Sequence, residues 1–254
     1  MSLGATIARA VRSGAQVEIL TVFGCGPRST SAAGTWDSKS GFRTEGEASR
    51  ARRREDWEAC RILGATPRWL DFGGEPYERG ASPREILSAV IGAIAGADCA
   101  LIPGFPLVHR DHADLSRLLL SAHLPCRVAL YAEQPYVFYA RKAWQPAMRA
   151  EAIEQQLLGT LHWTHRRADR WERRMKRRAV RCYRSQMWQL GLSHVGLYRM
   201  LWHESSRGGE AIAWLPPSYG DAPIIKSVRN KWKASRPLPG GGKSASAGAL
   251  PLDE

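Results

Sequence analysis

The sequence predicts an α/β protein in which helices cover both faces of a parallel sheet. Short apolar runs, such as 17–23 and 99–103, alternate with longer stretches that carry apolar residues every three or four positions. Runs that are apolar at most positions are typical of parallel strands buried on both faces. Strands that alternate with amphipathic helices favour this architecture over an all-helical or all-β fold.

The elements are predicted in a regular order. Strands are expected at 17–23, 69–72, 99–103 and 128–131, and helices at 1–13, 47–63, 113–122 and from the cap Ser82 to the stop Gly96. Ser82, Pro83 and Glu85 form a capping-box start, and Gly64 is a typical helix end. Residues 27–46 are predicted to be a loop.

The second half of the chain is predicted less regularly. The stretch 148–190 is expected to be helical and basic, with one apolar stripe packed on the domain. The segment around Trp202 and Trp214 is expected to be irregular but ordered. Beyond Ala234 the composition turns to Pro, Gly, Ser and Lys, so we predict one folded domain over 1–233 and a disordered tail over 234–254.

Composition narrows the class of protein. The five cysteines are scattered without a Cys-x-x-Cys pair, which favours reduced thiols and a cytoplasmic location. No apolar run reaches the roughly 18 residues of a membrane-spanning helix.

The net charge of +13 favours nucleic acid, an anionic surface or an acidic substrate as partner. Its two arginine clusters, at 50–54 and 166–184, lie in predicted helices, so a solvated basic face is the simpler interpretation.

The motif His109-Arg110-Asp111-His112 follows the apolar run 99–103. The carboxyl ends of parallel strands are where open α/β sheets bind ligands. Neutral imidazole is a good zinc ligand, and a neighbouring carboxylate can orient a second histidine for proton transfer. An exposed polar loop explains the motif equally well when it is taken alone.

Other motifs occur in an informative order around this one. They are Ser2 to Ala8, Arg52-Arg53-Arg54-Glu55, the motif at 109–112, Tyr131-Ala132-Glu133-Gln134-Pro135-Tyr136, and Lys176 to Ala179 followed by Tyr183, Ser185 and Gln186. Together they resemble the PIG-L/LmbE-like zinc-dependent N-deacetylases over residues 2 to about 215. That resemblance implies a Rossmann-like fold and the removal of acetyl groups from amino sugars and related conjugates.

The resemblance also implies roles for individual residues. His112 would be a zinc ligand, His109 would stabilise the oxyanion and protonate the leaving amine, and Asp111 would orient His109. Arg52 and Tyr131 would contact substrate, although a surface ion pair and a packed tyrosine explain them equally well. Zinc is the expected cofactor, since it polarises the carbonyl and lowers the pKa of bound water to about 7.

Part of the family's site has no counterpart in this sequence. The resemblance implies that a His-x-Asp-Asp motif ending the first strand supplies the other ligands and the general base. We therefore expect a fold whose first strand is missing, an unpaired strand edge, and absent or impaired activity. An N-terminally truncated deacetylase and a degenerate homologue both fit this pattern.

The expected function is zinc-dependent hydrolysis of an N-acetyl or N-acyl amide on an amino sugar or glycoconjugate. The alternative is a catalytically inactive homologue that binds an acidic polymer or nucleic acid through its basic surface. We expect a small-molecule partner and no membrane partner. Nucleic acid is disfavoured because no nucleic-acid-binding motif is present, and a homo-oligomer is left open.

Overall fold

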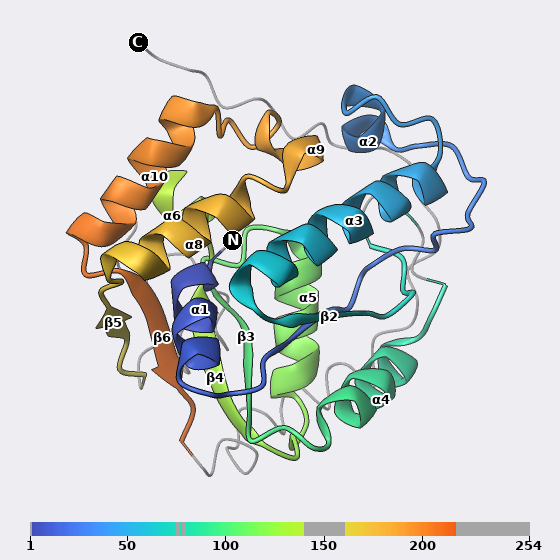
Figure 1. Cartoon of the computed structure of the whole chain (residues 1–254). Coiled ribbons are helices and arrows are strands. Elements are labelled where there is room, and N and C mark those ends of the chain that lie inside the picture. Colours follow the sequence, from blue (N-terminus) through green and yellow to red (C-terminus); the bar gives the residue numbers. More distant parts are fainter. Residues whose placement is uncertain (1, 75–76, 78–79, 140–160, 217–254) are drawn as a thin grey trace.

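The computed structural model describes residues 2–74, 77, 80–139 and 161–216 (Figure 1). These residues form two sheets. In the first, β1 (Glu18–Thr21) pairs in parallel with β2 (Thr66–Trp69). The second has the order β3-β4-β6-β5, and β3 (Cys99–Phe105) is parallel to β4 (Arg127–Ala132). The antiparallel strands β6 (Glu210–Trp214) and β5 (Thr164–Arg166) complete it, so this sheet is mixed rather than wholly parallel.

Helices cover both faces of this arrangement, as predicted (Figure 1). One layer contains α1 (Gly4–Arg12), α3 (Glu45–Leu63) and α8 (Arg170–Val180), which share an apolar cluster. The other contains α4 (Pro83–Ile94) and α5 (Arg110–Leu120), whose apolar side chains pack on β3 and β4. Ile19 of β1 packs against the first cluster and Leu20 against the second. Because successive strand residues point to opposite faces, β1 lies between two helical layers.

The helix boundaries follow local sequence signals. Ser82 and Glu85 form the predicted capping box at α4, and Thr44 with Glu47 forms a second one at α3. Gly64 adopts a left-handed conformation with φ of 75° directly after α3. Other side chains are unfavourable there, which explains why the helix ends at this residue.

Several boundaries differ from the sequence-based predictions. The segment predicted as a loop over 27–46 contains α2 (Thr35–Lys39) and the first residues of α3. The strand predicted at 69–72 is β2, three residues earlier, where its backbone pairs with β1. Within the stretch predicted as helical over 148–190, the described residues form β5, α8 and α9 (Arg184–Met187). Trp202 lies in α10 (His194–Ser206) and Trp214 in β6, so this segment is regular rather than irregular.

Two further predictions concern the ends of the sheets and of the chain. Among the described residues, β1 and β3 each pair with one strand only and share no ladder, which agrees with the expected unpaired edge. The tail predicted over 234–254 lies outside the described residues. None of the helices in the described ranges has both the length and the apolar character to cross a bilayer.

A buried charge cluster joins the last helices to the first. The ammonium of Lys176, on α8, lies 2.7 Å from a carboxylate oxygen of Glu204 on α10 and 2.7 Å from one of Glu210 on β6. Burial alone would lower the pKa of Lys176, but the two carboxylates raise it. Glu210 also accepts hydrogen bonds from the backbone N–H groups of Ala5 and Thr6, in the first turn of α1. We call Lys176, Glu204 and Glu210 the charge cluster.

We predict that Lys176→Met strongly destabilises the protein. The substitution leaves two buried carboxylates without their cation, a change that costs about 3–5 kcal/mol. The free energy of unfolding, measured by urea denaturation, should fall by that amount. Lys39→Met, on the exposed side of α2, is the matched control and should change it by less than about 0.5 kcal/mol. Equal stability of the two variants would contradict the importance of the cluster.

Candidate active site

The motif at 109–112 forms the start of α5. The strand β3 ends at Phe105, and His109 is the N-cap of the helix that begins at Arg110. The sequence placed this helix at 113–122, three residues too late, because His109 is not among the commonest capping residues. Asp111 and His112 therefore lie on the first helical turn, at the carboxyl end of β3 and close to the residues that follow β4.

His109 is oriented by the backbone of its own helix. Its Nδ1 accepts a hydrogen bond of 3.2 Å from the backbone N–H of Asp111. A neutral imidazole that accepts at Nδ1 carries its proton on Nε2, so the tautomer follows from this hydrogen bond. The side chain is 39% exposed. His109 therefore carries its N–H donor on Nε2.

Asp111 is buried close to His109. Its Oδ2 lies 4.0 Å from Nδ1 of His109, which is within ion-pair range but longer than a hydrogen bond. A Cβ at Gly74 would come within 2.6 Å of the same oxygen, so the glycine leaves room for the carboxylate. The structure thus brings the predicted pair together, with the backbone hydrogen bond as the closer constraint on His109.

His112 is paired with a buried carboxylate that sequence reasoning did not single out. Its Nδ1 lies 3.0 Å from Oε1 of Glu133, whose side chain is 1% exposed. The approach does not meet the geometry of an aligned hydrogen bond, and both carboxylate oxygens of Glu133 are buried without another partner among the described residues. A carboxylate at Nδ1 favours the Nδ1–H tautomer and leaves Nε2 available for a ligand. The only sequence signal for Glu133 was its place in the motif at 131–136.

The pKa values of two tyrosines near Glu133 are raised. Burial, with a smaller contribution from the charge of Glu133, raises the pKa of Tyr136 to about 12 and that of Tyr131 further. Tyr136 meets the ring of His112 edge-on, with centroids 6.4 Å apart, and the rings of His109 and His112 are 5.1 Å apart. Tyr131, expected to contact substrate, lies in the centre of the β3-β4-β6-β5 sheet, between β3 and β6.

Arg52 is held by a separate polar cluster. Its guanidinium pairs with Asp37 of α2, a carboxylate that is 1% exposed. The hydroxyl of Tyr77 donates to the other oxygen of Asp37 at 2.6 Å. Among the described residues, the contacts around Arg52 tie α3 to α2 and do not reach the histidines. Its predicted contact with substrate remains a prediction.

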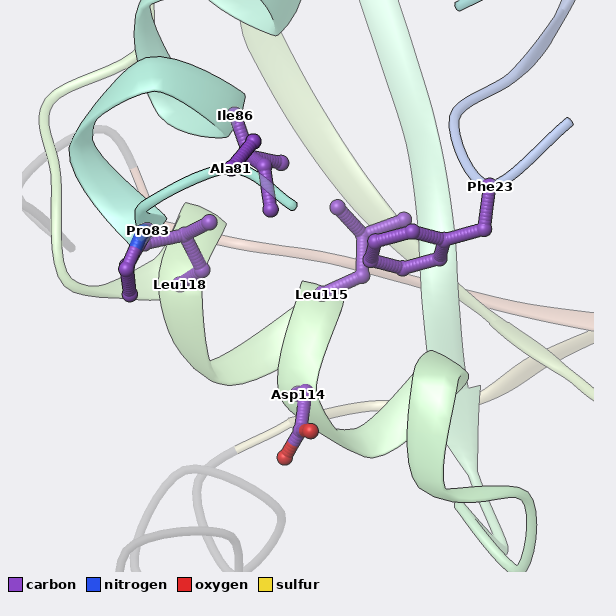
Figure 2. A pocket seen from close by; sticks show the side chains of 7 residues that line it. All are labelled: Phe23, Ala81, Pro83, Ile86, Asp114, Leu115 and Leu118. Carbon is purple, nitrogen blue, oxygen red and sulfur yellow. The ribbon is translucent and has the colours of Figure 1, made fainter. Parts of the chain in front are cut away.

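A small apolar pocket lies beside the motif rather than over it. Figure 2 shows it between α4 and α5, lined by Phe23, Ala81, Pro83, Ile86, Asp114, Leu115 and Leu118. Asp114 stands one turn after the motif and is paired with Arg110 and Arg117. The pocket includes neither His109 nor His112, so the candidate site is defined by the histidines and not by this pocket.

The residues within the described ranges do not form a complete zinc centre. No group of three or more histidine, cysteine, aspartate or glutamate side chains within these ranges is arranged to hold a metal ion. His112, backed by Glu133, has the chemistry of a single ligand, whereas a catalytic zinc normally needs three protein ligands. The described side chains therefore supply one part of such a centre at most.

A family model matches the part of the chain that contains the motif. Residues 1–123 match the family described as PIG-L: GlcNAc-PI de-N-acetylase. The predicted resemblance to PIG-L is confirmed. This match ends just after α5, so it includes the motif at 109–112 and leaves out Glu133.

Solved structures of deacetylases share the fold. The chain is 22% identical to the A40926 pseudoaglycone deacetylase Dbv21, with a TM-score of 0.66 over 84% of this chain and 90% of that one. The zinc-inhibited form of teicoplanin deacetylase Orf2 is 19% identical, with a TM-score of 0.63 over 84% of this chain and 91% of that one. The N,N'-diacetylchitobiose deacetylase from Pyrococcus horikoshii is 17% identical, with a TM-score of 0.52 over 89% of this chain and 83% of that one. The chain thus has the Rossmann-like fold of the LmbE-like deacetylases.

Curated relatives give a shorter match. Siroheme synthases from Edwardsiella ictaluri (strain 93-146) and Ectopseudomonas mendocina (strain ymp) are each 33% identical, over 110 and 92 residues. These matches cover 41% and 34% of this chain and 23% and 20% of the relatives. The chain therefore spans less than a quarter of the length of the curated relatives that it matches.

We predict that Glu133→Gln allows the neutral imidazole of His112 to adopt either tautomer. The carboxylate favours a proton on Nδ1, whereas an amide can donate or accept and so permits both tautomers. The ¹⁵N chemical shifts of the imidazole, assigned with a His112→Gln variant, report the tautomer directly. Glu58→Gln, at an exposed position of α3, is the matched control and should leave these shifts unchanged. An unprotonated Nδ1 in the parent protein would contradict the proposed pairing.

Proposed function

We propose that this protein serves the hydrolysis of an N-acetyl or N-acyl amide on a small amino sugar or glycoconjugate. The observation that carries the proposal is the pair of half-exposed imidazoles on the first turn of α5, in a segment that matches the PIG-L family. Teicoplanin and diacetylchitobiose, named in the solved deacetylases, are both glycoconjugates or amino sugars and support this class of substrate.

His109 is proposed as the electrophilic and acidic group. Its Nε2–H can donate to the oxygen of the amide carbonyl as negative charge develops there. Once water has added to the carbonyl carbon, a protonated His109 would transfer a proton to the nitrogen of the leaving amine, so that the C–N bond breaks and a carboxylate and a free amine are released. The carboxylate of Asp111, 4.0 Å away, would stabilise the protonated imidazole.

His112 is proposed as the residue that faces the expected zinc. Glu133 is proposed as its positioning residue, because a carboxylate at Nδ1 directs Nε2 away from the protein core. Zinc, where a full set of ligands holds it, polarises an amide carbonyl and lowers the pKa of water. The described residues do not offer that full set. We therefore propose that the chain of 254 residues, by itself, is inactive or impaired.

A second candidate function rests on charge. The outer face of α8 exposes arginines 170, 173, 174, 177 and 178, while its buried face carries Met175 and Ala179. Such a face suits an inactive homologue that binds an acidic polymer or nucleic acid. Binding of this kind weakens steeply as salt rises, because counterions compete for the same arginines.

We predict that the 254-residue chain holds much less than one zinc ion per molecule after dialysis. A single imidazole ligand binds zinc weakly compared with a three-ligand centre. Metal content, measured by mass spectrometry after the chain has been loaded with zinc and dialysed, tests this expectation. Any zinc that is retained should be lost in His112→Gln and kept in the matched control His123→Gln. Stoichiometric zinc on the 254-residue chain would show that the ligands lie elsewhere.

His109→Gln should separate catalysis from metal binding. Where the encoded protein releases acetate from an N-acetylated amino sugar, this variant should lower kcat about 10²–10⁴-fold, because it removes the proton donor. KM and metal content should stay close to those of the parent. A variant that loses metal as well would place His109 among the ligands, and unchanged kcat would exclude the proposed role.

A further inference from the structure

Helix α10 and the turn before it expose large apolar side chains. Val195, Tyr198 and Trp202 are 67%, 66% and 64% exposed, and Trp188, just after α9, is 86% exposed. Residues at positions i, i+3 and i+7 of a helix lie on one face, so the three side chains of α10 form a continuous stripe. This stripe points to solvent rather than to the core.

The fold itself does not use this stripe. The opposite side of α10 carries Leu197 and Met200, which are buried in a cluster with Val180 of α8 and Phe138. The helix thus already has its core contacts. Single exposed apolar residues are ordinary, but several large ones gathered along one helix mark an interaction surface.

The exposed charged side chains within the segment that carries the stripe are all cationic, and Glu58 of α3 lies 4.0 Å from one of them, Arg184. Arg184, Arg199 and Arg207 are exposed in the segment 184–207. The only carboxylate of that segment, Glu204, is buried and paired with Lys176. The same ion pair joins α10 to α8, and Figure 1 shows α8, α9 and α10 grouped at one side of the molecule. Helix α8, which this ion pair joins to α10, exposes further arginines at 170, 173, 174, 177 and 178.

We propose that this region binds the surface of an anionic lipid bilayer. The aromatic–arginine surface is defined as Arg184, Trp188, Val195, Tyr198, Arg199 and Trp202. Trp and Tyr combine an apolar ring with a polar group and concentrate where bilayer and water meet. An amphipathic helix that carries such rings beside arginines lies in that interface, and anionic lipid headgroups attract the guanidinium groups.

Two other occupants explain the surface less well. Base stacking on a nucleic acid would account for Tyr198 and Trp202 but gives no role to the exposed aliphatic Val195. A second copy in a twofold dimer would place this arginine-bearing face against itself. With no exposed carboxylate in 184–207 to pair with, Arg199 would repel its counterpart.

This proposal revises the expectation of no membrane partner. That expectation rested on the lack of a long apolar run, which bears on spanning a bilayer and not on binding to its surface. The proposal is independent of the chemistry at His109 and His112, since the aromatic–arginine surface shares no residue with the candidate active site.

Co-sedimentation with vesicles tests the proposal. The full chain should bind vesicles of mixed phosphatidylcholine and phosphatidylserine and bind vesicles of phosphatidylcholine alone much more weakly. The variant Trp188→Ser/Tyr198→Ser/Trp202→Ser should lower the partition constant for the mixed vesicles at least about tenfold, because three rings no longer enter the interface. Arg184→Gln/Arg199→Gln should lower it as well and reduce its dependence on salt.

The control is Trp57→Ser, which removes a tryptophan that is 53% exposed on α3, a helix that contributes no residue to the aromatic–arginine surface. It should bind vesicles like the parent, and circular dichroism should show that every variant is folded. Any of three results with the vesicles would overturn the proposal: no binding to the mixed vesicles, equal binding by the triple variant, or a preference for a single-stranded oligonucleotide that competes the protein off the vesicles. A concentration-dependent dimer abolished by the triple variant would overturn it in favour of a second copy.

Discussion

The structure depends on one buried ammonium group. Lys176 neutralises Glu204 and Glu210, and it also donates to the backbone carbonyl of Ser2 at 3.0 Å. The hydroxyl of Ser2 in turn accepts a hydrogen bond from the backbone N–H of Gln134, next to Glu133. Removing any partner of a buried charge leaves that charge uncompensated and destabilises the fold. The charge cluster therefore fixes where α1 begins and, through Gln134, the backbone that carries the partner of His112.

Buried carboxylates in this protein fall into two groups. Glu210 has Lys176 and two backbone N–H groups as partners, and Glu172 has Arg9 and Arg12, so these charges are fully compensated. Glu133 is as deeply buried, yet among the residues that the structure describes its one neighbour at ion-pair distance is the half-exposed His112. A buried charge with so little compensation is costly to the fold and is typical of a site that holds a ligand or proton. This contrast separates the candidate site from the scaffold.

Sequence reasoning was most accurate where a local signal decides the structure. The capping box at Ser82 and the glycine stop at Gly64 mark helix ends through contacts within a few residues. It was least accurate where pairing across the sheet decides. The strand β6 forms because residues 210–214 pair with β4 and β5, and no periodicity in so short a run reveals this. The role of Glu133 is likewise a contact between α5 and the end of β4, which spacing along the chain does not encode.

The candidate site lies where the ends of strands from the two sheets approach each other. Asp111 follows β3, whereas Gly74, which makes room for its carboxylate, follows β2. The two sheets thus meet at the motif, although β1 and β3 share no hydrogen bonds among the described residues. Side chains of Val22 and Ile102 belong to one apolar cluster across this boundary, so side-chain packing helps to join the sheets there. Because backbone groups along a strand edge require hydrogen-bond partners, the edges of β1 and β3 that carry no ladder among the described residues are where a further strand could pair, beside the motif.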